Sequence, residues 1–206
     1  MSQGYGYKQK QFEDAQKKAV RESVLVGCIA QVKAFNAKAM TVDVKPLSKD
    51  LQGGSYTSAS AMLGIPVMCF RGGGLVVRPW YKEGDIGAVL YIDHDIDKAM
   101  AGAECEPNTE RNHSPEDGIF VGGLVPSGAP LEGLPDDAVV IGTADGSVYL
   151  AVSSKGIEIK GDITHKGNTD QEGETTISQE LTVSGIPYTP HTHTSTAPGS
   201  ETSPPH

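Results

Sequence analysis

The chain has 206 residues and a formal net charge of −9, with 17 lysines and arginines against 26 aspartates and glutamates. An acidic chain without a basic stripe is a poor binder of nucleic-acid backbones, so we expect no nucleic-acid partner. Hydrophobic residues make up 37% and aromatic residues 6%, and the 25 glycines and 13 prolines favour turns over helices. This composition indicates an elongated protein whose second half buries its apolar side chains against other copies of itself.

The cysteines and the first residues bear on where the chain folds. Cys28, Cys69 and Cys105 are odd in number and widely spaced, so we expect free thiols and folding in a reducing cytosol. The residues from Met1 to Tyr5 open no apolar stretch, so we expect no signal peptide. No apolar run approaches the roughly 18 residues of a membrane-spanning helix.

Residues 1–22 are predicted to form an N-terminal arm or short helix, because Phe12, Ala15 and Ala19 have a weak helical spacing. From Ser23 the pattern changes to the alternation typical of strands. Five strands over residues 23–98, the first two forming a long hairpin, predict a small barrel of the oligonucleotide/oligosaccharide-binding (OB) type. The strands expected there are Val24 to Phe35, Met40 to Lys45, Ile65 to Phe70, Leu75 to Pro79 and Ile86 to Ile92.

Two features of this region each allow two interpretations. Trp80 is either an exposed anchor for a partner or the main aromatic residue of the barrel core. The acidic cluster Asp93, His94, Asp95 and Asp97 is either a cation site or the polar end of the last barrel strand. We favour the polar strand end, because alternation sends neighbouring side chains to opposite faces.

Residues 99–136 are predicted to be an irregular linker, and residues 137–186 a series of short strands with a turn about every ten residues. Apolar side chains alternate with polar ones through Val148, Leu150 and Val152, and again through Ile157, Ile159 and Ile163. This pattern favours a thin β-helix. Because one turn of such a helix cannot bury its apolar face alone, stacking and trimerisation must cover it.

The sequence shows no catalytic motif. Glu104 and Glu106 lie in the predicted linker, where a glycosidase pair is unsupported, and no cysteine has a plausible histidine partner. We therefore expect that the protein is not an enzyme.

His191 and His193 are the candidate metal ligands, in a predicted apex over residues 187–206. On an extended segment, side chains at this spacing point to the same face. One pair cannot fill a metal shell, but three copies around a threefold axis would supply six imidazoles. The competing interpretation is two solvated histidines in a disordered tail.

Three parts of the chain resemble the central spike proteins of contractile-tailed phages, the membrane-piercing baseplate tips of Mu-like and related myophages. They are the barrel from about Ser23 to Asp97, the strands from Ala138 to Gly185, and the ending Val183 to His193 with its tail of Gly, Ser, Thr and Pro. The resemblance implies an all-β fold with an N-terminal OB-fold-like barrel followed by an intertwined trimeric β-helix needle with a metal-capped apex.

The resemblance also implies a metal. In that family each chain gives a His-x-His pair, so His191 and His193 of three chains would hold one iron ion with octahedral geometry. Six imidazoles suit Fe(II), and also Ni(II) or Co(II), whereas protein zinc sites prefer four ligands. A full shell leaves no position for substrate or water, so the ion would be structural.

The implied function is that of a structural virion protein at the tail baseplate tip. It would be assembled as a homotrimer in the host cytoplasm and bound to baseplate hub and tail tube proteins. Sheath contraction would drive it through the host outer membrane, a purely mechanical contact. Two alternatives remain open: an OB-type glycan- or protein-binding module with a disordered tail, and a metalloenzyme at His191 and His193.

Overall fold

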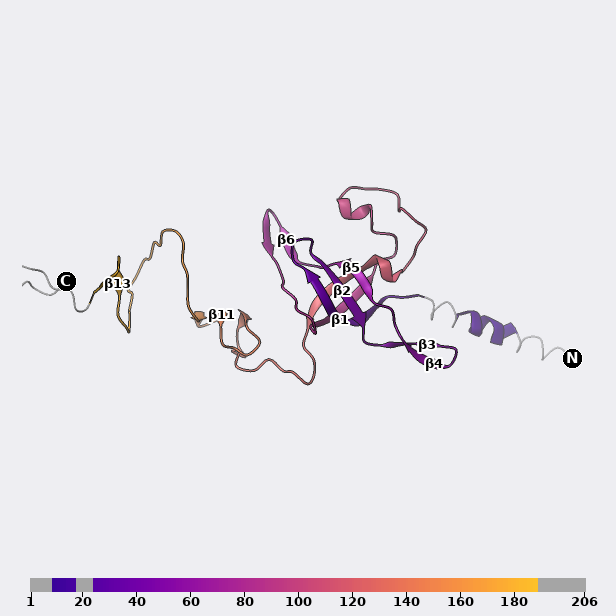
Figure 1. Cartoon of the computed structure of the whole chain (residues 1–206), viewed down its shortest axis with the longest axis horizontal. Helices are drawn as coiled ribbons and strands as arrows, with labels where there is room; N and C mark the ends of the chain where they lie inside the picture. The colour runs from indigo at the N-terminus through magenta and orange to yellow at the C-terminus, as the bar shows by residue number, and fades with distance from the viewer. Residues whose placement is uncertain (1–8, 18–23, 189–206) are drawn as a thin grey trace, which may run out of the picture. The chain divides into compact units, whose positions relative to one another are not determined.

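The computed structural model describes residues 9–17 and 24–188, and the chain divides into two units, Met1–Lys160 and Gly161–His206 (Figure 1). Residues 9–17 are helical, within the region where the sequence predicts an arm or short helix. His191 and His193, the predicted metal ligands, lie outside the described residues. Within the described part of the chain, every helix is too short or too polar to cross a membrane.

The first unit contains a five-stranded antiparallel sheet with the strand order β5-β2-β1-β8-β9. The hairpin of β1 and β2 is the one that the alternation predicts, with Val42 and Val44 turned inward and Thr41 and Asp43 less buried. The strand bounds are β1 (Gly27–Asn36), β2 (Thr41–Pro46), β5 (Met62–Pro66), β8 (Ile86–Tyr91) and β9 (Gly118–Leu124).

This sheet curls into a half-barrel, so that its two edge strands approach each other. Directly after β5, Val67 forms a parallel bridge with Phe120 of β9, and the Met68 N–H donates to the Phe120 carbonyl oxygen at 2.9 Å. Register shifts interrupt the pairing of β1 with β2, β2 with β5 and β8 with β9. Such bulges increase local twist, which lets a short sheet bend this far.

The core of the half-barrel is small and aliphatic, with one central aromatic group. Phe120 is completely buried, and the Tyr81 ring meets it edge to face at 5.4 Å between centroids and meets Phe35 at 5.5 Å. Trp80 is 71% exposed, so the interpretation of Trp80 as the main core aromatic is wrong. The buried cluster consists of Ala30, Val32, Val42, Val44, Met62, Ile65, Val67, Val89 and Phe120.

The structure differs from the sequence prediction in which segment supplies the fifth strand. Leu75–Val77 (β7) pairs with Phe70–Gly72 (β6) as a hairpin apart from the five-stranded sheet. The fifth strand is instead β9, from the segment predicted to be linker. The glycines of β9 are typical of a loop, which is why the sequence pattern predicts a linker there. In the structure, a Cβ at Gly122 would collide with the Tyr81 ring, so close packing explains the glycine.

Two further strands form a second hairpin in the segment between β2 and β5, where the sequence analysis expects no strand. These are β3 (Lys49–Gln52) and β4 (Ser55–Ser58), with Leu51 opposite Tyr56. The three cysteines are free, as predicted.

A separate three-stranded meander follows, made of β10 (Val139–Gly142), β11 (Tyr149–Ser153) and β12 (Gly156–Lys160). These are short strands joined by turns, as the alternation predicts for residues 137–160. The alternation also favours strand structure through Ile163, whereas in the single chain β12 ends at Lys160.

In the second unit, residues 161–181 form no strand, and a small hairpin follows, made of β13 (Thr182–Val183) and β14 (Ile186–Pro187). A β-helix made of three chains draws its hydrogen bonds from neighbouring copies, so a single chain cannot form it. The intertwined needle therefore stays a prediction.

Candidate functional site

Two groups of residues stand out in the described part of the chain. One is a buried ionic network in the loop between β8 and β9. The other is an apolar sheet face on β10–β12 that residues 9–17 and 24–188 leave uncovered.

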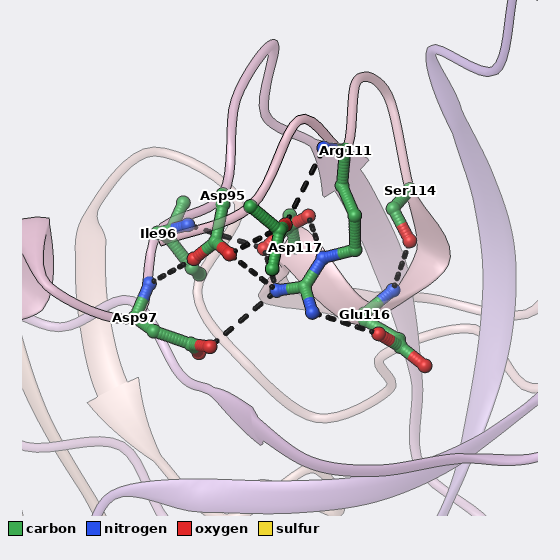
Figure 2. A network of polar contacts seen from close by, with 8 residues as sticks. Asp95, Ile96, Asp97, Arg111, Ser114, Glu116 and Asp117 are labelled. Atoms are coloured by element: carbon green, nitrogen blue, oxygen red, sulfur yellow. Dashed lines mark hydrogen bonds and ion pairs between the residues drawn. The ribbon is translucent and has the colours of Figure 1, made fainter. Parts of the chain in front are cut away.

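The ionic network is centred on Arg111 (Figure 2). Its guanidinium donates to both carboxylate oxygens of Asp117, from Nε to Oδ2 at 3.1 Å and from Nη2 to Oδ1 at 3.0 Å. Nη2 also lies 3.2 Å from Asp95 Oδ2, and Nη1 lies 3.1 Å from Glu116 Oε2. The carboxylates of Asp95 and Asp117 have no exposed surface. Arg111 is therefore the counter-ion of two buried charges.

The remaining oxygens of the two aspartates are also occupied. The Thr109 hydroxyl donates to Asp95 Oδ2 at 2.7 Å, and the Asp97 N–H donates to Asp95 Oδ1 at 2.9 Å. These hydrogen bonds, followed by the charge of Arg111, lower the pKa of Asp95. The Ile96 N–H donates to Asp117 Oδ1 at 3.1 Å, and hydrogen bonding to Asp117 raises the pKa of Arg111.

This network answers the question left open for the acidic cluster. Among residues 9–17 and 24–188, no three His, Cys, Asp or Glu side chains are arranged to hold a metal ion. The donors of Arg111, Thr109 and the backbone take the oxygens that a cation would use. The interpretation as the polar end of a strand fits this arrangement, and the network fixes the loop to the start of β9. Sequence reasoning missed Arg111, because the spacing of residues 93–97 carries no signal for a partner in the same loop.

The apolar face is formed by two rows of side chains across β10–β12. The register places Val139 beside Val152 and Ile157, and Ile141 beside Leu150 and Ile159. Successive side chains of a strand alternate between faces, so all six project from one side of the meander. Their exposed fractions run from 37% at Leu150 to 75% at Val139.

On the opposite face of the meander, the side chains are covered by contacts within the same chain. Tyr149 and Ala151 are buried there. The Tyr149 hydroxyl donates to Glu158 Oε1 at 2.6 Å, which raises the pKa of Tyr149, and Lys160 Nζ lies 5.5 Å from the centre of the Tyr149 ring. The contrast between the two faces shows which side of the sheet lacks a partner.

The half-barrel and its ionic network lie in a segment that is similar to a known protein domain. Residues 29–123 match the family model of the phage protein Gp138 N-terminal domain. The matched segment begins in β1 and ends in β9, so it contains the curled sheet and the loop that carries Arg111. The match covers slightly under half of the chain and supports a phage structural protein and a place in the virion. No curated protein sequence matches the chain.

Only one of the two groups of residues lies inside the segment that matches the Gp138 N-terminal domain. The ionic network lies inside the matched segment and stabilises that domain. The apolar face of β10–β12 lies beyond its end, in the part of the chain that the match does not describe.

Proposed function

We propose that the protein is the central spike of a contractile phage tail or a related prophage-derived particle. In this proposal the N-terminal half-barrel attaches the spike to the baseplate, and three chains intertwine from residue 137 to form a rigid shaft. His191 and His193 cap the point with iron, and sheath contraction drives the shaft through the host outer membrane. The spike performs no catalysis.

The observation that carries the proposal is the uncovered apolar face of β10–β12. Six large aliphatic side chains on one face of a three-stranded sheet need a partner surface. Full burial of one such side chain contributes about 1.5–3 kcal/mol. Three copies around a threefold axis would turn these faces toward one another and bury them together, which meets the cost of association.

The half-barrel supports the attachment role. Its strand order and the parallel bridge between Val67 and Phe120 fit the partly open five-stranded barrel of the OB type. A phage protein domain at this end of the chain fits a component that joins the shaft to other tail proteins, namely the baseplate hub and tail tube.

The chemistry of the donor set supports the metal. Neutral imidazoles are good ligands for Fe(II), and two per chain become six in a trimer. A six-coordinate ion has no open position, so it would cross-link three chain ends and stiffen the point where fraying is easiest.

The decisive experiment is size-exclusion chromatography with light scattering on the full chain, combined with element-specific X-ray fluorescence. We expect a species of three times the chain mass of 21.7 kDa that contains one iron ion. A monomer without metal would contradict the proposal and favour the OB-type binding module. A metal-containing chain with an open coordination position and measurable turnover would favour a metalloenzyme.

A further inference from the structure

The hairpin of β6 and β7 presents an apolar surface that the described residues of its own chain leave open. Phe70 lies opposite Val77, and Leu75 lies opposite Gly72, so the three side chains share one face. Phe70 is 76% exposed and Leu75 is 78% exposed. The exposed indole of Trp80 follows three residues after the end of β7.

The charge of this hairpin is opposite to that of the whole chain. Residues 68–82 contain Arg71, Arg78 and Lys82 and no acidic residue, whereas the chain carries a net charge of −9. An apolar surface flanked by arginines fits a partner surface that is apolar in the centre and acidic at its edge.

A surface of that kind exists on the same half-barrel. A cavity of about 790 Å³ is lined by Met62, Leu63 and Ile65 of β5 and by Tyr91 of β8. The Tyr91 hydroxyl donates to Cys28 Sγ at 3.2 Å, so this polar group already has a partner. The charged residues in the lining are both acidic, Asp50 and Glu116.

The cavity and the hairpin lie at opposite ends of the curled sheet. Met62 and Tyr91 line the cavity, at the end where β5 begins and β8 finishes. Pro66, at the other end of β5, pairs with Thr41 where β2 begins, and the hairpin begins at Phe70, three residues after Val67. Phe70 and Val77, at the base of the hairpin, line a different pocket together with Tyr81 and Val121, and no residue of the hairpin is in the lining of the cavity. The hairpin of one chain therefore does not fill the cavity of the same chain in this structure.

We propose that the β6–β7 hairpin of one copy docks in the cavity of a second copy. Phe70, Leu75 and Val77 bury their side chains against Leu25 and Leu63, the exposed leucines of the cavity lining, and Arg71 and Arg78 lie near Asp50. Such a head-to-tail contact uses a different surface on each side, and it closes into a ring when the rotation allows. The proposal rests on the proposed trimer and assigns the half-barrels an interface of their own.

The test is disulfide cross-linking of the full chain. Cys28, Cys69 and Cys105 are first replaced by serine, and Leu63→Cys and Leu75→Cys are then combined. Both leucines are more than 70% exposed, so the changes should leave the fold intact. After mild oxidation, we expect covalent dimers and closed trimers on a non-reducing gel. The chains with Leu63→Cys or Leu75→Cys alone, and the pairing of Leu75→Cys with Met100→Cys, are the controls and should stay uncross-linked.

A charge exchange tests the same contact without a bond. Arg71→Glu with Arg78→Glu should slow cross-linking by roughly tenfold, the range of one or two lost charge pairs. Adding Asp50→Lys should restore part of the rate. A trimer by light scattering that forms no Leu63–Leu75 cross-link overturns the inference and leaves the proposed spike intact, and cross-linking to a baseplate protein in its place also overturns it. A monomer overturns both.

Discussion

Arg111 holds Asp117 through two parallel hydrogen bonds, at 3.1 Å from Nε and 3.0 Å from Nη2, and Asp117 immediately precedes β9. Bidentate pairs of this kind are stronger and more directional than single contacts. The pair thus ties the long loop after β8 to the strand that completes the half-barrel. Without Arg111, the carboxylates of Asp95 and Asp117 would be buried without a counter-ion.

Replacing Arg111 with methionine should destabilise the half-barrel strongly. Breaking one side of a buried ion pair leaves an uncompensated charge, and we expect the melting temperature to fall by roughly 10 °C or more. Circular dichroism on heating measures this. Lys38→Met removes an exposed cation in the turn between β1 and β2 and should shift the melting temperature by about 2 °C at most. Equal melting of the two variants would contradict the structural role of the network.

Lysine at position 111 should rescue only part of this loss. A lysine ammonium is a point charge and lacks the planar fork that meets both Asp117 oxygens and reaches Asp95 and Glu116. We expect the melting temperature of Arg111→Lys to lie between those of the methionine variant and the native chain. A native value would mean that charge alone stabilises the loop.

The turn between β10 and β11 should lose stability in acid. Hydrogen bonds from the Thr143 side chain and from the Ser147 N–H and hydroxyl lower the pKa of Asp145 from 3.8 to about 2. A carboxyl whose pKa is lower in the folded state than in the unfolded state stabilises the folded state. This stabilisation is complete when the pH is above the pKa of the unfolded chain. The stability is lost as the pH falls from about 4 toward 2.

The measurement is an NMR titration of the Asp145 carboxyl together with local stability of the meander between pH 5 and pH 2. We expect the titration midpoint near pH 2, and Asp145→Asn should flatten the acid dependence of the β10–β11 turn. Asp170→Asn, at an exposed position outside the strands, is the control. A midpoint of Asp145 near 4 would show that the hydrogen bonds do not persist in solution.

The sequence predicted some parts of this fold well, and the successes and failures have physical causes. Val42 and Val44 alternate with polar residues because one face of β2 is buried, and that pattern is visible in one chain. In contrast, the sequence pattern places β9 in the linker, because Gly118 and Gly122 resemble turn residues. Glycine is needed at these positions because a Cβ at Gly118 would collide with Val89 and a Cβ at Gly122 would collide with Tyr81. Both contacts depend on tertiary packing.

The candidate sites follow the same division. The alternation around Leu150 predicts the apolar face, since it depends only on neighbours along a strand. Arg111 was not predicted, because its partners meet only when the loop closes. His191 and His193 stay a prediction, because they lie outside the described residues.

Removing the Phe120 ring should nearly unfold the half-barrel. Phe120 is fully buried, contacts Tyr81, and carries the backbone bridge to Val67. Phe120→Ala should cost about 3–5 kcal/mol of unfolding free energy in a urea titration. Phe12→Ala, the same change at a residue that is 63% exposed, should cost less than about 0.5 kcal/mol. Similar costs for both would place Phe120 outside the core.

Replacing both His191 and His193 with alanine should remove the iron and leave the trimer. The shaft is expected to hold three chains through its buried aliphatic surface, while the ion acts only at the end. Metal analysis and light scattering on the same sample separate these effects. His94→Ala with His165→Ala, which removes two histidines elsewhere, should keep the iron. Loss of the trimer with the metal would show that the ion, and not the shaft, holds the chains together.

A charge on the apolar face of β10–β12 should prevent trimer formation. Ile159 lies in the row with Ile141 and Leu150, and in the proposed shaft its side chain turns toward the other chains. Burying an unpaired lysine among aliphatic groups costs several kcal/mol for each copy, and a trimer repeats this cost three times. We expect Ile159→Lys to be monomeric by light scattering, while Ser154→Lys, in the exposed turn before β12, stays trimeric. A trimeric Ile159→Lys would mean that this face looks outward, and the half-barrels alone would then have to hold the three chains.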